Sequence, residues 1–414
     1  MLEQIEGSLG VAKAVALCRP GVVCAYPISP QTHIVENVGK FVKNGTLKDC
    51  DFLNVESEFS AISVAIGSEV GGARTYTATA SQGLLYMTEG VYSASGLGLP
   101  IVMTVASRAI GGPINILDDH SDSLSQRDSG WLQLFCESNQ DAVDTHIMAF
   151  KIAEEVGLPV MVCMDGFVLT HAFERLDIPS QETVDKFLPE YQPREYLTPK
   201  EPVSIGAMVG PEAFTEVRFL QQRKMAKALK VIEKVTKEYR DLTGSKSGGL
   251  LDCYNCENAD LKLVIMGSTV GTAKDEIDRL KAEGINVGII SLKSFRPFPY
   301  EAMAKAIGDT KKVICLERAF SFGARGIVCP EVKRAMEGKN CDVKTVVAGL
   351  GGRPIFGTTI RGIVKDALAD KFTEEFTWFD VNADVLNSYT DKTEGVTFKN
   401  GPIAQSVLEN SVKD

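Results

Sequence analysis

The chain has 414 residues, of which 44% are hydrophobic and 24% are charged, and its formal net charge is -10. This length exceeds one ordinary hydrophobic core, so we expect two domains. The negative charge argues against nucleic acid or an anionic membrane as the main partner, because no basic field attracts either of them. The sequence has no apolar run long enough for a membrane span, and its start, MLEQIEGSLG, does not resemble a signal peptide. A cytoplasmic protein is therefore expected.

In the first 170 residues, strand patterns alternate with helix patterns. Such alternation predicts parallel strands joined by crossover helices in a doubly wound sheet. We expect strands ending at Tyr26 and at 51–57, 75–80, 100–107, 131–136 and 159–164. We expect helices at 7–18, 31–43, 58–70, 84–96 and 140–156. Residues 109–130, rich in Gly, Asp and Ser, are expected to form a loop.

The second part of the chain begins with residues 176–210, which are rich in Pro and Glu. We expect them to form an excursion from the domain and not one of its packed layers. A long helix is expected over 212–242, with Gly244 as its stop, and 245–258 is the best linker candidate. A second alternating series then predicts a four-strand α/β domain. Its strands are expected at 261–267, 285–295, 311–317 and 343–349, and its helices at 272–282, 300–307, 324–336 and 359–369. We therefore expect domains at 1–248 and 259–370, followed by an irregular polar tail at 371–414.

The ten cysteines lie mostly inside apolar runs such as VVCAY and VMVCM, which indicates buried free thiols in a reducing compartment. One pair, Cys253 and Cys256, has the CxxC spacing of half a zinc site or a redox pair. No second CxxC or nearby His accompanies it, so a structural role or chance spacing is favoured. The sequence also lacks the cysteine spacing of a ferredoxin, so no iron–sulfur cluster is expected within this chain.

Five strands of the first domain end at polar or conformationally restricted residues. Ligands of parallel α/β sheets bind in the crevice outside the carboxyl ends of the strands. We call the edge of this crevice the rim. The residues predicted to line it are Ser29, Glu58, Gln82, Arg108 and Asp165. A carboxylate, an arginine and small hydroxyl groups on one rim indicate an anionic, cofactor-assisted site.

A further polar segment, residues 118–122 (DDHSD), carries side chains of the metal-ligating type. One His among flexible acids is common without a metal, so a solvated or interface loop is favoured. No resident metal is expected in this chain. The glycine-rich run at 349–352 does not extend to a dinucleotide-binding GxGxxG motif, and no P-loop is present.

Taken in series, these motifs resemble a known family. Those that carry the resemblance are Tyr26–Pro30, Glu56–Glu58, Thr79–Leu85, Ser107-Arg108 and Asp165–Phe167, then Phe295–Pro299 and Ala319–Ala324. The first group resembles the pyrimidine-binding domain of 2-oxoacid:ferredoxin oxidoreductases, and the second resembles the domain that follows it. The resemblance is nearest to the alpha subunit of the multi-subunit members that act on pyruvate (pyruvate synthase). It implies two doubly wound α/β domains, the second similar to the C-terminal domain of transketolase.

The resemblance implies that the chain binds thiamine diphosphate, whose aminopyrimidine must adopt its imino form to act as a base. A carboxyl group hydrogen-bonded to the pyrimidine ring nitrogen promotes that tautomer, and the family match gives this role to Glu58. A glutamate at a helix N-terminus is also favoured by the helix dipole, and both roles are compatible. Glu56 is the alternative if the register is shifted by two residues.

The remaining site residues are also implied by the resemblance. Arg108 holds the carboxylate of the 2-oxoacid, for which the guanidinium fork is suited. Ser29 stands where the family usually has Thr, and it keeps a hydroxyl group for the substrate or coenzyme. Pro27 shapes the pocket, Gln82 contacts the coenzyme, and His120 is a candidate for a supporting role.

The GDG…N segment that binds diphosphate and Mg²⁺ in thiamine enzymes is not found in this sequence. The resemblance therefore implies that beta-, gamma- and delta-type subunits supply that half of the site, the Mg²⁺ and the [4Fe-4S] clusters, in a dimer of heteromers. The expected reaction is the reversible decarboxylation of pyruvate to acetyl-CoA and CO2, with coenzyme A as co-substrate and ferredoxin as electron acceptor. Two alternatives remain: another substrate, such as a branched-chain oxoacid or oxalate, or a non-catalytic dinucleotide-binding or assembly subunit.

Overall fold

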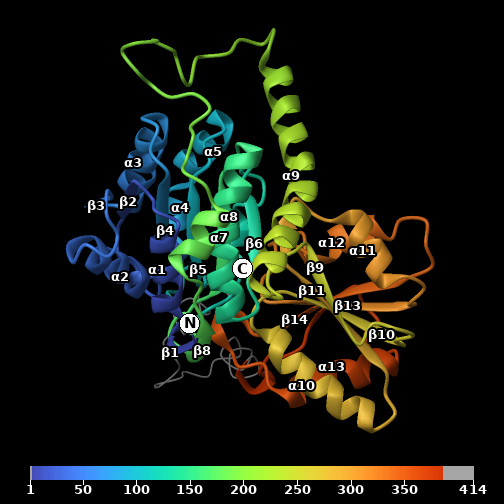
Figure 1. Ribbon diagram of the computed structural model, residues 1–414. Helices are drawn as coiled ribbons and strands as arrows, with labels where there is room; N and C mark the ends of the chain where they lie inside the picture. The colour runs from blue at the N-terminus through green and yellow to red at the C-terminus, as the bar shows by residue number, and fades with distance from the viewer. Residues whose placement is uncertain (1, 386–414) are drawn as a thin grey trace, which may run out of the picture.

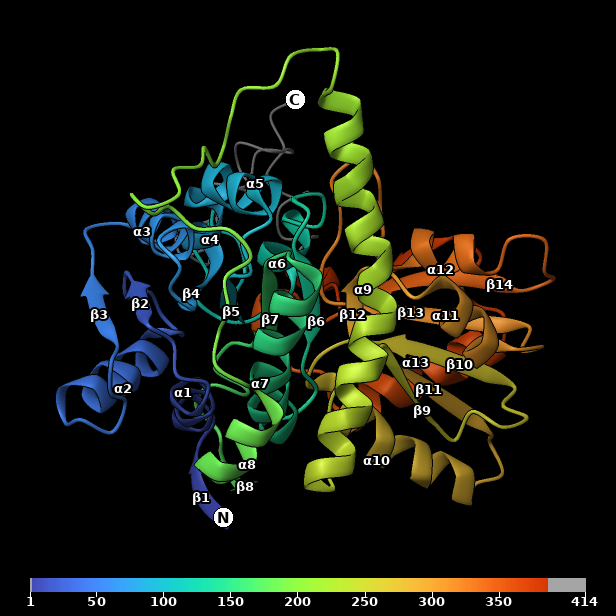
Figure 2. The same cartoon turned by 45° about the horizontal axis from the view of Figure 1, so that its top comes forward.

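The computed structural model describes residues 2–385, which form two α/β units on separate sheets (Figure 1). Helix α9 (Phe214–Thr243) lies between these units, and its N-terminal end projects beyond both of them in two views (Figures 1 and 2). It ends at Gly244, whose φ of +75° is the left-handed conformation of a helix stop. The predicted long helix and its stop are therefore confirmed.

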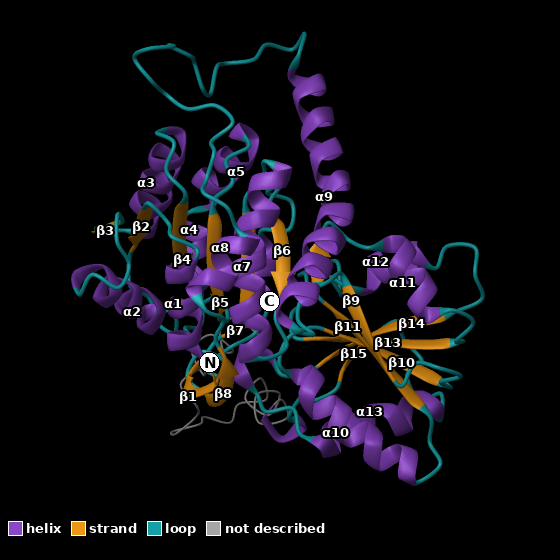
Figure 3. Ribbon diagram, viewed as in Figure 1, coloured by secondary structure: helices purple, strands orange, loops and turns teal. Residues whose placement is uncertain are grey.

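The first sheet has seven strands in the order β12-β6-β7-β5-β4-β2-β3, and all neighbours are parallel except the edge pair β12 and β6. The bounds are β2 (Val22–Ala25), β3 (Asp51–Asn54), β4 (Thr75–Thr79), β5 (Val102–Ser107), β6 (Leu132–Phe135), β7 (Val160–Asp165) and β12 (Ser294–Arg296). A separate two-stranded ribbon pairs β1 (Leu2–Glu6) with β8 (Phe173–Asp177). Each sheet lies between helices (Figure 3), so the predicted doubly wound arrangement is confirmed.

Helices cover the two faces of the first sheet because its strands are apolar on both sides. The core on one face includes α1 (Gly7–Leu17), α2 (Thr32–Lys43) and α7 (Asn139–Val156), together with α8 (Gln181–Phe187) and part of α9. The core on the other face includes α3 (Glu58–Val70), α4 (Ser81–Tyr86) and α5 (Thr88–Leu97). Fully buried strands on such a sheet are near-continuous apolar runs, as observed here.

The second sheet has six strands in the order β15-β14-β13-β10-β11-β9, of which only β9 runs antiparallel. The bounds are β9 (Leu251–Tyr254), β10 (Leu261–Ile265), β11 (Val287–Leu292), β13 (Lys312–Glu317), β14 (Asp342–Val347) and β15 (Phe376–Trp378). The core on one face includes α10 (Thr269–Ala282) and α13 (Gly357–Leu368). The opposite face, with α11 (Tyr300–Ile307) and α12 (Cys329–Ala335), shares one apolar core with α3 and α5, so the two units pack together.

The structure corrects four predictions about elements. The second sheet has six strands instead of four, because the expected linker contributes β9 and the expected tail contributes β15; residues 386–414 of that tail lie outside the described residues. The strand expected at 285–295 is divided at Lys293, after which β12 joins the first sheet. The helix expected at 84–96 is divided into α4 and α5, and the loop expected at 109–130 contains α6 (Ser121–Ser125). The exact domain limits stay a prediction.

The part of the chain that the structure describes contains no helix with both the length and the hydropathy that crossing a bilayer requires.

The CxxC pair lies on the edge strand β9 and the turn after it, where Cys253 is exposed and Cys256 is partly buried. The adjacent Cys256 thiol lowers the pKa of Cys253 to about 7, although partial burial opposes this. Burial raises the pKa of thiols in the cores, such as Cys18 and Cys24, to about 12. Reactivity follows the thiolate, so Cys253 differs from the buried cysteines.

We predict that Cys253 is alkylated first by iodoacetamide, at a rate that rises as the pH increases through 7 because the thiolate then forms. Peptide mass spectrometry over a pH series on the folded chain measures this rate, and Cys50 is the comparison, since burial raises the pKa of its thiol to about 11. Equal rates at Cys253 and Cys50 near neutral pH would contradict the prediction.

Candidate active site

The predicted rim lies where the strand order of the first sheet reverses. The chain passes from β2 outward to β3 and then returns to the other side of β2 to form β4. The carboxyl ends of β2 and β4 therefore border a topological switch point, which is the usual ligand crevice of an open α/β sheet. Residues following β2, β3, β4 and β5 include Ser29, Glu58, Gln82 and Arg108, respectively.

Glu58 is the first residue of α3 and is buried. The preceding Ser57 caps this helix, because its Oγ accepts the N–H of Ser60 at 3.1 Å. Among the described residues, no hydrogen bond reaches the Glu58 carboxylate. The Oγ1 of Thr79, at the end of β4, is buried and also lacks a partner within this part of the chain. Buried polar groups without partners mark a place where a ligand can supply the missing bonds.

Gly83 makes room for the Glu58 carboxylate at the start of α4. A Cβ at this position would lie 2.7 Å from Glu58 Oε1 and 2.6 Å from Thr79 Oγ1. Both contacts are shorter than real carbon contacts, so a side chain here would displace the carboxylate. Glu56 is placed differently, since it is exposed and accepts a hydrogen bond from the Ser60 hydroxyl. The structure thus buries Glu58, and not Glu56, at the topological switch point.

Arg108 and Ser29 are brought together across the sheet. Arg108 is buried, its Nη1 donates to the Ser29 carbonyl at 2.8 Å, and its Nε donates to the Asn115 carbonyl at 3.2 Å. No hydrogen bond to Nη2 is found in the described region. The two N–H groups of Nη2 thus remain available for an anion. The Ser29 hydroxyl and Pro27 are exposed on the same rim.

Gln82 lies against the loop that follows β5. A Cβ at Gly111 would lie only 1.8 Å from Gln82 Nε2, so the glycine is needed for this approach. The neighbouring Ser81 has a φ of +49°, which is unfavourable for a non-glycine residue. Its Oγ donates to the Ala109 carbonyl at 2.5 Å, which holds the ends of β4 and β5 together.

Asp122 stabilises this strained turn. From the sequence it was predicted to lie in a solvated or interface loop. It is completely buried, and its Oδ2 accepts the backbone N–H groups of Ser81 at 2.8 Å and Arg108 at 2.9 Å. Its Oδ1 accepts the N–H of Ser123 at 2.6 Å. Burial raises the pKa of Asp122 to about 7, although these donors oppose the shift. The only sequence signal was its place in an acidic segment, which did not distinguish it from its neighbours.

Asp165, expected on the rim, instead connects the two units. Its carboxylate contacts His120 Nε2 at 2.9 Å, Arg318 Nη1 at 2.8 Å, and the Ser268 hydroxyl at 2.6 Å. Burial disfavours the Asp165 charge, but His120 and Arg318 hold its pKa below the ordinary value. Arg318 also pairs with Asp118. His120 therefore has a supporting role in the interface between the units and has no contact with Glu58 in the structure.

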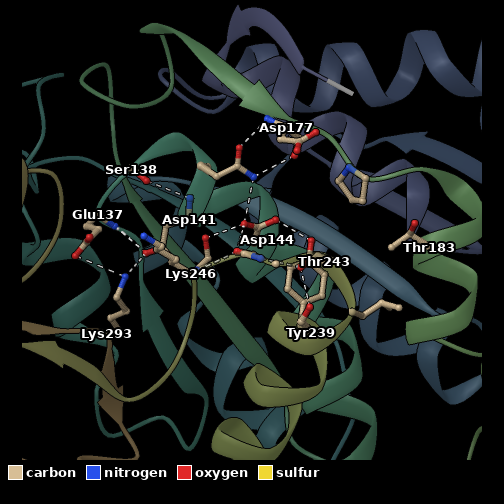
Figure 4. Close-up of a pocket in the computed structure, with 16 residues that line it drawn as sticks. Glu137, Ser138, Asp141, Asp144, Asp177, Thr183, Tyr239, Thr243, Lys246 and Lys293 are labelled. Atoms are coloured by element: carbon tan, nitrogen blue, oxygen red, sulfur yellow. Dashed lines mark hydrogen bonds and ion pairs between the residues drawn. The ribbon is translucent and has the colours of Figure 1, made fainter.

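A second polar interface borders a cavity of about 620 Å³ near the start of α7 (Figure 4). Lys293, at the break between β11 and β12, lies between Glu137 and Asp141, with its Nζ 2.8 Å from Asp141 Oδ2 (Figure 4). Burial opposes its charge, but the two carboxylates raise the pKa of Lys293 above its ordinary range. None of Ser29, Glu58, Gln82 and Arg108 lines this cavity, so it is separate from the predicted rim.

Comparisons with known proteins agree with this geometry. Residues 13–237 match the family described as pyruvate flavodoxin/ferredoxin oxidoreductase, thiamine diphosphate-binding, and residues 259–360 match pyruvate:ferredoxin oxidoreductase core domain II. Pyruvate synthase subunit PorA of Methanocaldococcus jannaschii is 46% identical over 365 residues, covering 87% of this chain and 93% of the relative. The PorA of Methanosarcina barkeri is 43% identical, covering 87% and 91%. Ketoisovalerate oxidoreductase subunit VorA of Pyrococcus horikoshii is 38% identical, covering 91% and 97%.

Solved structures show the same fold. A 2-oxoglutarate:ferredoxin oxidoreductase from Magnetococcus marinus, with 2-oxoglutarate, coenzyme A and succinyl-CoA bound, has a TM-score of 0.67 at 22% identity; the match covers 89% of this chain but 65% of that chain. A split-gene transketolase has a TM-score of 0.52 at 14% identity, covering 89% and 99%. The predicted thiamine-enzyme fold is therefore confirmed. With family matches to both units and relatives over most of its length, the chain belongs to the pyruvate flavodoxin/ferredoxin oxidoreductase family.

Proposed function

We propose that this chain is the alpha subunit of a pyruvate:ferredoxin oxidoreductase, which converts pyruvate and coenzyme A to acetyl-CoA and CO2 and reduces ferredoxin. The observation that carries the proposal is the buried Glu58 carboxylate, which has no partner among the described residues and lies at the switch point beside Gly83. The family match to a thiamine diphosphate-binding domain and the names of the PorA relatives support the activity.

The residues at this point fit the pyrimidine end of thiamine diphosphate. When bound, the coenzyme supplies the electron sink that decarboxylation of a 2-oxoacid requires. Glu58 would hold a proton at its carboxyl group and hydrogen bond to the pyrimidine ring nitrogen. Thr79 offers its unpaired hydroxyl, while Gln82 and Pro27 would border the ring. The chemistry of this donor set matches a neutral, nitrogen-rich ring better than a diphosphate.

Substrate binding is assigned to Arg108 and Ser29. The free Nη2 of Arg108 would donate two hydrogen bonds to the substrate carboxylate, because its Nη1 and Nε already hold the Ser29 and Asn115 carbonyls. These same bonds fix the guanidinium in place, which lowers the entropy cost of binding. The exposed Ser29 hydroxyl would contact the acyl portion of the substrate or the coenzyme.

The diphosphate and Mg²⁺ half of the site is assigned to a beta-type partner, and the [4Fe-4S] clusters to further partner subunits. Exposed large apolar side chains lie on the segments that carry the site residues: Tyr26, Leu53, Phe59, Tyr86 and Ile114. The ring centroids of Phe59 and Tyr86 are 6.1 Å apart, and these residues lie on the helices that begin with Glu58 and contain Gly83. An exposed apolar group beside polar residues is typical of a protein interface, so we expect the partner to cover the crevice here.

A second candidate is the same complex acting on a branched-chain 2-oxoacid. The VorA relative of Pyrococcus horikoshii, described as a ketoisovalerate oxidoreductase subunit, covers the chain as fully as the PorA relatives do. Ser29 favours this alternative in one respect, because a Ser leaves more space than the Thr usual in the family. A non-catalytic assembly subunit is the remaining alternative.

Glu58→Gln is predicted to lower the kcat of the reconstituted complex by at least about 100-fold, because an amide cannot hold the acidic proton at the coenzyme. Pyruvate- and coenzyme A-dependent reduction of a viologen dye measures this rate. The matched control is Glu56→Gln, which changes an exposed carboxylate two residues away and should retain activity within about twofold. Wild-type activity of Glu58→Gln would favour the assembly subunit.

Ser29→Thr is predicted to narrow the acyl pocket. One added methyl group changes discrimination by about 10- to 200-fold, so the kcat/KM for 2-oxoisovalerate should fall at least about tenfold relative to that for pyruvate. The same dye assay with both oxoacids measures the ratio. Equal changes in kcat/KM for the two substrates would show that Ser29 does not line the acyl pocket. A wild-type complex that prefers 2-oxoisovalerate to pyruvate would establish the second candidate.

Tyr86→Glu is predicted to weaken association with the partner subunits at least about tenfold, because it places a charge in the proposed apolar interface. Co-purification of a tagged chain with its partners, followed by sedimentation of the complex, measures assembly. Phe173→Glu is the control, since Phe173 is comparably exposed on β8, outside the rim. Unchanged assembly of Tyr86→Glu would place the partner on another face.

A further inference from the structure

Two of the four histidines of the chain meet one glutamate at the surface of the first unit. Glu6, His33 and His171 come from β1, the first turn of α2, and the turn between β7 and β8. One ligand atom from each side chain lies within 4.8 Å of the other two. We propose that these three residues form a binding site for a divalent transition-metal ion of the Zn²⁺ class. This proposal is independent of the proposed enzymatic function.

The donor set suits such an ion. Zn²⁺ binds imidazole nitrogen and carboxylate oxygen, and sites with two His and one Glu leave a fourth position for water. His33 Nδ1 lies 2.7 Å from Glu6 Oε1, so these atoms share a proton that a metal ion can replace. Bonds of about 2.0–2.1 Å at tetrahedral angles place ligand atoms about 3.3 Å apart. The side chain of His33, which is exposed, would turn to close this difference.

His171 is held in an orientation that a metal ligand requires. Its ring packs between Phe167 and His33, with centroid distances of 4.8 Å to each. Its Nδ1 lies 2.7 Å from Thr170 Oγ1, which also accepts the N–H of Phe167 at 2.8 Å. A ligating histidine usually makes a hydrogen bond through its other ring nitrogen. With Nδ1 engaged by Thr170, Nε2 of His171 is the nitrogen that would bind a metal.

The backbones that carry Glu6 and His171 are already fixed together. The N–H groups of Gly7 and Ser8 donate to the carbonyls of Ala172 and Thr170 at 3.0 and 2.9 Å. The buried Ser8 hydroxyl also donates to the Thr170 carbonyl, at 2.7 Å. These bonds place Glu6 beside His171 without a metal ion, so little backbone ordering opposes binding. This site differs from the two sequence segments that suggested a metal, 118–122 and the CxxC pair, and no resident metal was expected in the chain.

Metal binding would stabilise the segment that carries Ser29 on the predicted rim. His33 follows Ser29 by four residues, and the Pro30 between them packs on Gly166, where a Cβ would lie 2.6 Å from Pro30 Cγ. The Ser29 carbonyl in turn holds Arg108. A metal ion at His33 would thus connect β1 and the turn after β7 to the segment that positions Arg108.

The test uses the full chain, purified with a chelator and titrated with Co²⁺ as a spectroscopic probe and with Zn²⁺ by calorimetry. We expect one site per chain whose Co²⁺ complex has visible d–d absorption without the near-ultraviolet charge-transfer band of thiolate ligands. Zn²⁺ should also raise the melting temperature, because it binds the folded state. His171→Ala and Glu6→Gln should each weaken Zn²⁺ binding at least about tenfold.

Two controls make the outcome decisive. Glu3→Gln changes another β1 glutamate, which pairs with Lys13, and it should bind Zn²⁺ as the wild type does. The double variant Cys253→Ser and Cys256→Ser removes the CxxC pair and should retain the same site. Binding that shows a thiolate band and is lost in the cysteine variant would overturn the proposal, as would wild-type affinity in Glu6→Gln, whose charge is removed without a change of shape.

Discussion

The buried Asp122 carboxylate is the interaction on which the candidate site depends. Its Oδ2 accepts N–H groups from the ends of β4 and β5, and so joins the backbones of Ser81 and Arg108 at one point. The left-handed φ of Ser81 costs conformational energy, and the Asp122 bonds offset that cost. Because the ends of these two strands are joined, Gln82 and Arg108 face one crevice. Removing the carboxylate would leave buried N–H groups unpaired, which typically costs about 1–3 kcal/mol for each group.

The second unit extends this support from outside the first sheet. Arg318 and Ser268 bind Asp165 at the end of β7, while Lys293 binds Asp141 and its chain continues into β12 of the first sheet. Each of these buried charges has a partner from the other unit or from a neighbouring segment, as buried ions require. The edge strand β12 and the shared apolar core then make the two sheets one packed body. The second unit is therefore bonded to the first sheet at the end of β7 and along its edge strand β6.

Most of the fold was predictable from the sequence because strands buried on both faces give continuous apolar runs between helical patterns. The rim residues Ser29, Glu58, Gln82 and Arg108 were found by their positions after such runs. The role of Asp165 was not predicted, because an aspartate at a strand end has the same sequence pattern whether it binds a ligand or an arginine of another domain. Strands β9 and β15 were missed because edge strands carry polar side chains and lack that apolar signal. The contact among Glu6, His33 and His171 depends on tertiary packing, which no local pattern encodes.

The polar groups of the first unit differ in whether the chain itself supplies their hydrogen-bond partners. Asp122, Asp165 and Asp144 all have several donors supplied by the chain itself, including the Tyr239 hydroxyl at 2.7 Å from Asp144. Glu58, Thr79 Oγ1 and Arg108 Nη2 have none within the described residues. Desolvation of such groups costs free energy, and a molecule bound at the switch point would offset that cost by completing their hydrogen bonds. An acid, a hydroxyl and a guanidinium are groups that suit a ligand with a nitrogen base and a carboxylate. The coenzyme and the 2-oxoacid of the proposed function would together supply both of these groups.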